Sequence, residues 1–201
     1  TLGQAGDHLG AVELLDTGLG EIPEGDPMVR GRVLAARARV LRWMGRWEEC
    51  ERDSRAAIAL AGSVGTPAWL ADAWVTLFAA LDSLRRTDER EAVFREALVV
   101  VERSGDPETT IRLMNNRGAC LMFEGREDEA IDWYQRGLAR AVEFDATRSP
   151  MVGGILANLF DTTLHRGQVT ESQRWLDELE RMTADGSGPD DPDLDGGLAM
   201  R

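Results

Sequence analysis

The stretch from Asp106 to Leu138 reads DPETTIRLMNNRGACLMFEGREDEAIDWYQRGL and holds the pattern that decides the fold. It opens with Asp106 before Pro107, an N-capping residue type followed by the residue favoured at the first helical position. Gly125 follows 18 residues later, and acidic residues come after it, as expected where one helix ends and the next begins. Apolar residues recur at spacings of three, four and seven, which is typical of amphipathic helices. The stretch therefore predicts two helices joined by a tight turn.

The same pattern recurs along the chain with a period near 40 residues. Each helix start is marked by a proline that follows aspartate, threonine or serine: Pro27, Pro67, Pro107, Pro150 and Pro192. Glycines at 45, 125 and 167 fall 17 or 18 residues after three of these prolines, whereas Arg85 holds this position in the second period. We therefore expect a differently built turn at Arg85. The repeat predicts an all-α fold of tandem helix–turn–helix hairpins stacked into an α-solenoid, with no strands.

The period also gives the boundaries of the repeats. We predict one superhelical domain over residues 1–201, made of an unpaired second helix at 6–22 and four full repeats at 27–61, 67–103, 107–144 and 150–183. Residues 192–201 would start the first helix of a further repeat. Because both ends then lack a partner helix, we expect a fragment of a longer array. Such uncapped ends leave apolar stripes open and predict self-association.

The pattern resembles the tetratricopeptide (TPR) repeat. The best match has Gly118 on the first helix, Ala130 and Gly137 on the second, and Tyr134 in the aromatic slot. The resemblance implies that the small residues let the two helices cross closely, and that the first helices line a concave groove for peptides. The period exceeds the usual 34 or so residues. In its longer repeat period the chain is similar to the repeat regions of large bacterial signal-transduction ATPases and transcriptional regulators.

Composition argues against several classes of function. A net charge of −13 is unsuited to nucleic acid, whose phosphates demand a basic face. No lysine is present to complete a phosphate-binding loop, no nucleophile has a histidine at a recognisable spacing, and no apolar run is long enough to span a membrane. The four histidines and cysteines lie in different hairpins, which makes a shared metal site improbable: His8, Cys50, Cys120 and His165. We expect no catalytic residue, metal or cofactor, and a cytoplasmic protein.

The first helix of the first full repeat carries five arginines and no acidic residue: Arg32, Arg37, Arg39, Arg42 and Arg46. Guanidinium groups bind carboxylates in a bidentate manner. Arg32, Arg39 and Arg42 are therefore candidates for binding an acidic peptide or anionic ligand in the groove. The alternative is that these arginines pair with Glu13 and Asp16 of the preceding helix, or face water.

Amides form a second candidate group. Asn115 and Asn116 lie in the third repeat, and Asn158, which is equivalent to Asn116, lies in the fourth with Asp161 nearby. An amide both donates and accepts, which suits binding of an extended peptide backbone. Hydrogen bonding between neighbouring helices is the alternative.

Trp133 and Trp175 occupy equivalent positions on second helices. They are either core residues or an exposed contact patch of the kind found at interfaces.

These features favour a non-enzymatic protein-interaction or ligand-sensing scaffold within a larger cytoplasmic regulatory protein, in signal transduction or transcription regulation. The alternative is a self-contained TPR adaptor that binds an acidic or C-terminal peptide in its concave groove. The family's carboxylate-binding groove uses lysine, which this sequence lacks.

Overall fold

The computed structural model describes residues 2–23, 25–64 and 66–184, and all regular structure in these ranges is helical. The chain divides into two compact units, Thr1–Ser104 and Gly105–Arg201, which are described separately. The first unit contains α1 (Leu2–Glu21), α2 (Pro27–Trp43), α3 (Trp47–Val64), α4 (Trp69–Ser83) and α5 (Thr87–Ser104). The second contains α6 (Pro107–Phe123), α7 (Glu127–Glu143), α8 (Pro150–His165) and α9 (Val169–Met182). The all-α class predicted from the sequence is confirmed.

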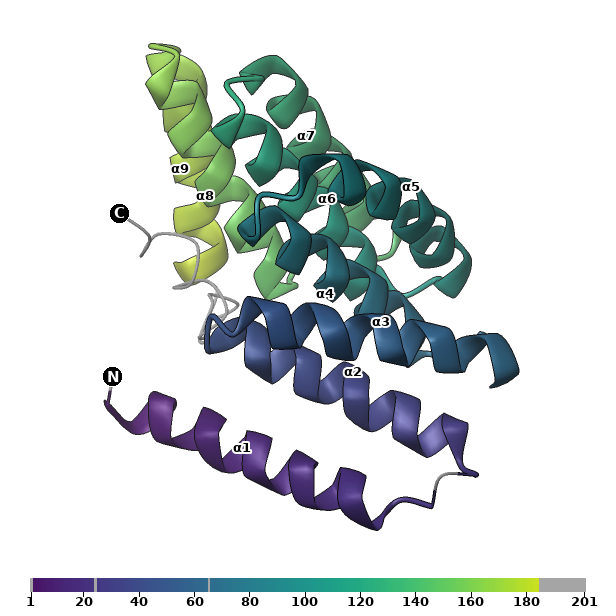
Figure 1. The fold of residues 1–201 in the computed structure, drawn as a ribbon. Helices are drawn as coiled ribbons and strands as arrows, with labels where there is room; N and C mark the ends of the chain where they lie inside the picture. The colour runs from purple at the N-terminus through teal and green to yellow at the C-terminus, as the bar shows by residue number, and fades with distance from the viewer. Residues whose placement is uncertain (1, 24, 65, 185–201) are drawn as a thin grey trace. The chain divides into compact units, whose positions relative to one another are not determined.

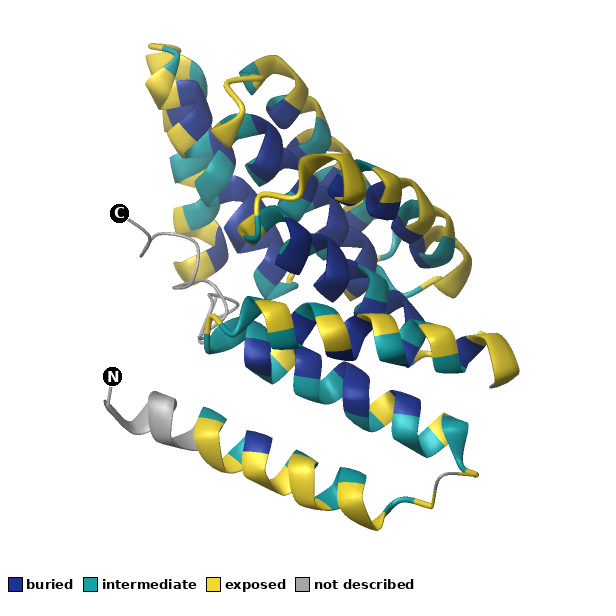
Figure 2. Ribbon diagram, in the orientation of Figure 1, coloured by how far each residue is buried: buried dark blue, intermediate teal, exposed yellow. Residues whose placement is uncertain are grey.

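Consecutive helices of the first unit form stacked hairpins (Figure 1). α2 packs on α3 and α4 packs on α5, while α4 also contacts α2 and α3 of the preceding hairpin. α1 packs against α2. The buried residues lie on the facing sides of these helices (Figure 2) and include Ala38, Leu41 and Cys50 in one cluster and Leu34 and Ala73 in another.

The second unit repeats this arrangement. α6 packs on α7, α8 packs on α9, and α8 also contacts α6 and α7. Its core includes an apolar cluster in which Ile111, Leu121, Tyr134, Ile155 and Leu159 are fully buried. Neither hairpin buries its apolar face alone, so stacking of successive hairpins supplies the core of each unit.

Three helices, α2, α6 and α8, start at a proline and are capped by the side chain of the residue before it. The side chains of Asp26 and Asp106 accept from backbone N–H groups three residues on, both at 3.0 Å, and Ser149 accepts from Met151 at 3.2 Å. α4 differs, because it begins at Trp69 with Ala68 in the capping position and no side-chain cap. Asp191 and Pro192 lie outside the described residues.

The turns inside the hairpins share one backbone geometry. Gly45, Gly125 and Gly167 have φ angles of 68°, 74° and 73°, and Arg85 has φ 58°. The residue after each of them donates its N–H to a carbonyl five residues back, as Arg86 does to Leu81 at 3.0 Å. The differently built turn expected at Arg85 is therefore wrong, because the arginine adopts the left-handed conformation that glycine adopts elsewhere.

The ends of the array also differ in detail from the sequence pattern. α1 runs without a break from Leu2 to Glu21, so it continues through Gly6, where the period placed the preceding turn. Residues 192–201, expected to begin a further helix, lie outside the described residues.

Candidate protein-interaction surfaces

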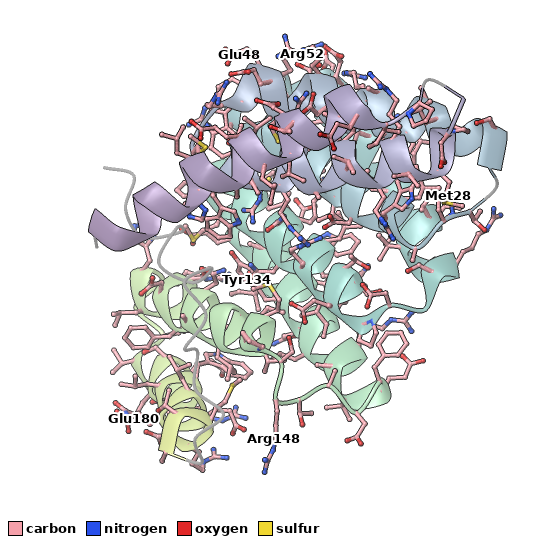
Figure 3. The ribbon with its side chains drawn as sticks, turned by 90° about the horizontal axis from the view of Figure 1, so that it is seen from below. Met28, Glu48, Arg52, Tyr134, Arg148 and Glu180 are labelled. Carbon is pink, nitrogen blue, oxygen red and sulfur yellow. The ribbon has the colours of Figure 1, made fainter. Side chains whose placement is uncertain are left out.

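Small residues bring the helices of each unit into close contact. A Cβ atom on Gly118 would lie 2.4 Å from the ring of Tyr134, and one on Gly137 would lie 2.5 Å from Ile155. Tyr134 is fully buried among the helices of the second unit (Figure 3). Only a glycine fits at such distances, so these contacts set the crossing of α6 with α7 and of α7 with α8.

The three candidate arginines of α2 lie in three different surroundings. Arg32 is exposed and makes no hydrogen bond or ion pair with any described residue. Arg39 is 51% exposed, and the nearest carboxylate oxygen, on Asp72 of α4, is 3.9 Å away. Arg42 is half-buried, and its guanidinium lies 4.1 Å from the centroid of the Trp43 ring.

The other two arginines of this stretch bind carboxylates within the first unit. Arg37 donates two hydrogen bonds to Asp53 of α3, at 2.6 and 2.9 Å, and also pairs with Asp16 of α1. The hydrogen bonds that Arg37 donates to Asp53 raise the pKa of Arg37, against the effect of burial. Arg46 forms a two-point pair with Glu49, with both distances 2.6 Å. The alternative reading, pairing with the preceding helix, thus holds for Arg37.

The asparagines of the second unit connect neighbouring first helices. The amide nitrogen of Asn158 on α8 donates to the side-chain oxygen of Asn115 on α6 at 2.8 Å. The side-chain amide nitrogen of Asn115 and the side-chain amide oxygen of Asn158 make no hydrogen bond with described residues, so each side chain keeps capacity for another partner. Asn116 is half-buried and Asp161 is exposed. Asn115 and Asn158 thus come together, whereas the three arginines belong to the other unit.

Trp133 and Trp175 are both half-buried and pack against the core of the second unit. Arginines of the same helices lie over their rings: Arg136 is 4.7 Å from the Trp133 centroid, and Arg174 is 5.7 Å from that of Trp175.

A groove beside Trp175 was not foreseen from the sequence. It has a volume of about 500 Å³ and lies between α7, α8 and α9, with Arg148 of the α7–α8 linker at its edge. The repeat pattern showed that Trp175 occupies the same position as Trp133. It could not predict a groove between three helices, because the groove depends on how those helices pack.

The described residues hold no group of three or more histidines, cysteines or acids able to bind a metal ion. Within the same ranges, none of the helices combines the length and the apolar character that crossing a membrane requires. Both cysteines are buried free thiols, and burial raises the pKa of Cys50 to about 12. The Cys50 thiolate is therefore scarce at neutral pH.

The stacked hairpins of each unit define a helical-repeat protein. No protein-family model and no curated protein sequence matches the chain, but solved structures do. BtubC from P. vanneervenii matches with a TM-score of 0.73 and 20% identity over 92% of this chain and 76% of BtubC. A putative kinesin light chain from Podosopora anserina, described by its nearly identical TPR-like repeats, matches with a TM-score of 0.64 and 15% identity, over 91% of this chain and 90% of that one.

A thermophilic TPR protein of Thermus thermophilus matches over 99% of this chain and 94% of its own, with a TM-score of 0.58 and 20% identity. At these identities the likeness concerns the fold. The chain has the tetratricopeptide-like repeat fold, as its sequence pattern indicated.

Proposed function

We propose that this chain is a non-enzymatic protein-interaction scaffold whose first helices bind an acidic peptide segment. The observation that carries the proposal is the exposure of Arg32 and Arg39 on α2. Arg32 has no carboxylate partner among the described residues, and the carboxylate partner of Arg39, Asp72, is 3.9 Å away. In a chain with 36 acidic and 23 basic residues, most arginines can find an internal carboxylate. Two exposed guanidinium groups on one helix, with Arg42 close by, form a local positive surface suited to carboxylates.

The three arginines share one face of α2. Arg32 and Arg39 are seven residues apart and Arg42 is three further on, so all project to the same side of the helix. The proximity of Arg39 to Asp72 directs this face toward α4, the first helix of the next hairpin. Stacked repeats use such continuous faces to bind partners.

The asparagines form a separate candidate contact for peptide backbone in the second unit. The unused amide donor of Asn115 and the unused oxygen of Asn158 can bind a peptide carbonyl and N–H respectively, because a peptide backbone presents both groups. The exposed Asp161 lies one turn beyond Asn158 on the same helix, and the half-buried Asn116 stays a further candidate contact. The wider setting that we propose, by analogy with the arrays that the repeat period resembles, is a larger cytoplasmic regulatory protein in which this scaffold senses a partner or ligand.

The test compares two charge reversals of equal size. The variant R32E/R39E/R42E alters the proposed surface, and R52E/R95E/R103E alters three exposed arginines on the second helices α3 and α5. Binding of a fluorescein-labelled peptide of alternating glutamate and serine is followed by anisotropy at low and physiological salt. We expect affinity to fall about tenfold or more, roughly 1.4 kcal/mol, in the first variant only.

Salt should weaken the wild-type interaction, since the charges are exposed. Equal affinities of the two variants would contradict the proposal and return the arginines to the class of solvated surface charges. Amidation of the peptide's C-terminus tests the adaptor alternative. A loss of affinity on amidation would assign the arginines to a C-terminal carboxylate instead of to acidic side chains.

A further inference from the structure

The groove between α7 and α9 has apolar walls and a charged edge. Seven apolar side chains line it: Leu138, Ala141 and Val142 from α7, Val152 and Leu156 from α8, and Trp175 and Met182 from α9. Val142 is 69% exposed, so the apolar wall reaches the surface at this point. The volume of about 500 Å³ lies within the range of sites that bind ligands.

Positive charges outnumber negative charges at this groove, because it is lined by three arginines and two acids: Arg148, Arg174, Arg181, Asp177 and Glu178. Glu178 pairs with Arg181 at 2.5 Å, and Asp177 accepts a hydrogen bond from Gln173 at 2.8 Å. Arg148 has no hydrogen bond or ion pair with described residues, and Figure 3 shows it extending from the linker away from the helices.

Arg174 is also available for a ligand. Its side chain is 68% exposed, and the one ion pair that it makes with a described residue, Glu171, is long at 3.6 Å. Two guanidinium groups therefore flank the groove, that of Arg148 without an ion pair to a described residue and that of Arg174 with one long pair, in a chain whose net charge is −13.

Trp175 adds an unsatisfied donor to the same place. Its indole N–H is buried and has no acceptor among the described residues, a condition that is unfavourable in a folded protein. The exposed side chain of Arg174 lies over the ring. A ligand oxygen that reached the indole N–H would supply the missing acceptor.

We propose that this groove is a second binding site, for a peptide segment that carries a bulky apolar side chain next to carboxylates. The apolar side chain would fill the space between Leu138, Val152 and Trp175, and the carboxylates would pair with Arg148 and Arg174. The groove is open between two helices of 17 and 14 residues, which suits a length of chain. A second copy of this acidic protein is a poorer occupant because of like-charge repulsion.

The site is independent of the first-helix surface, because it is formed mainly by the second helices α7 and α9. The probe is the end-blocked, fluorescein-labelled peptide Glu-Asp-Leu-Phe-Glu-Asp, titrated against the full chain. Two comparison peptides replace either its acids by serine or its Leu-Phe pair by glycine. We expect both replacements to weaken binding at least about tenfold, since the groove offers apolar and charged contacts together.

Three variants separate the contributions. R148E/R174E reverses the groove charges, V142D places a charge on its apolar lip, and all three residues are exposed, so the fold should tolerate the changes. R95E/R136E is the matched control, because it makes the same change in net charge at exposed positions outside the groove. We expect affinity to fall at least about tenfold in R148E/R174E and in V142D, and to stay within about twofold in the control.

Several results would overturn the inference: no binding of the probe by the wild type, equal losses in R148E/R174E and the control, or no effect of V142D. Self-association that V142D abolishes, without probe binding, would assign the groove to a second copy. The variant R32E/R39E/R42E should bind this probe normally. If it alone lost affinity, the acidic probe would be bound by the first-helix surface, and the groove proposal would fail while the proposed function stood.

Discussion

At the scale of single residues, Arg85 shows how strongly hairpin packing controls the backbone. It adopts the left-handed conformation, with φ 58°, that three glycines adopt in the equivalent turns. The side chain is exposed and has no hydrogen bond or ion pair with described residues. The strain of a left-handed non-glycine residue, about 1–2 kcal/mol, is therefore offset by no visible contact of its own.

Replacing Arg85 with glycine should stabilise the protein by about 0.5–1 kcal/mol, because the relief of strain exceeds the extra freedom of glycine in the unfolded chain. Urea denaturation of wild type and R85G measures this difference. R85A is the control, since it removes the same side chain but keeps the Cβ atom that causes the strain. Equal stability of R85G and R85A would contradict this explanation.

Individual residues also show what the sequence can and cannot predict. The small-residue positions Gly118, Ala130 and Gly137 were predictable, because close crossing of two helices excludes larger side chains. A hydrogen bond between neighbouring helices was one of the two alternatives for the asparagines, but its pairing of Asn115 with Asn158 was not predictable, since alignment of the repeats made Asn116 the equivalent of Asn158. Residues that are equivalent in the repeat need not touch each other in the folded protein. Contacts join the residues whose helix faces meet, and which residues these are depends on how the helices pack.

At the scale of helices and hairpins, the contact of Gly118 on α6 with Tyr134 on α7 determines how the third hairpin closes. Changing Gly118 to alanine places a Cβ atom 2.4 Å from the ring of a fully buried tyrosine. Overpacking of this kind costs about 1–3 kcal/mol, and the better helix propensity of alanine returns about 1 kcal/mol of that. We expect G118A to destabilise the protein by up to about 2 kcal/mol in a thermal or urea melt.

The matched change is Gly62 to alanine in α3, where an added Cβ atom meets nothing within 4 Å. G62A should stabilise by about 0.5–1 kcal/mol through helix propensity alone. If G118A proved as stable as G62A, α6 and α7 would not approach as closely as the structure places them.

Helix boundaries could be predicted where a polar cap precedes proline, as at Asp26 and Asp106, but not where packing decides. α4 starts at Trp69, beyond Pro67. The Trp69 ring packs so closely on Gly31 of α2 that a Cβ atom on this glycine would lie 2.5 Å from it. The groove beside Trp175 was likewise invisible in the sequence, because its walls come from three helices and its charged edge from a linker.

At the scale of the whole molecule, the same ion pair recurs at the N-terminus of three second helices, α3, α5 and α7. Arg46, Arg86 and Arg126 each bind the glutamate three residues on, with N–O distances of 2.6 Å. Hydrogen bonds from these arginines lower the pKa values of Glu49, Glu89 and Glu129 below their usual 4.5. A carboxyl group with a lowered pKa in the folded state stabilises the fold above its unfolded pKa, and this stabilisation is lost as pH falls through the folded value.

We therefore expect the midpoint of thermal unfolding to fall as the pH is lowered below about 4.5. The variant R46Q/R86Q/R126Q removes the partners and keeps the carboxyl groups. It should be less stable than wild type at neutral pH, and its midpoint should depend less on pH in the acid range. Parallel curves for the two proteins would show that other carboxyl groups govern acid unfolding.

Within each unit, every extensive helix contact joins helices that are one or two apart along the chain. A folding chain of this kind closes only short loops before its contacts begin to form, and local topologies of this type fold in roughly microseconds to milliseconds. Its stability is then a sum over neighbours, so a helix with few neighbours opens before the rest. α1 packs on α2, and among its described side chains one, Val12, is buried. It is therefore the segment from which exchange of amide hydrogens with solvent would spread into the first unit.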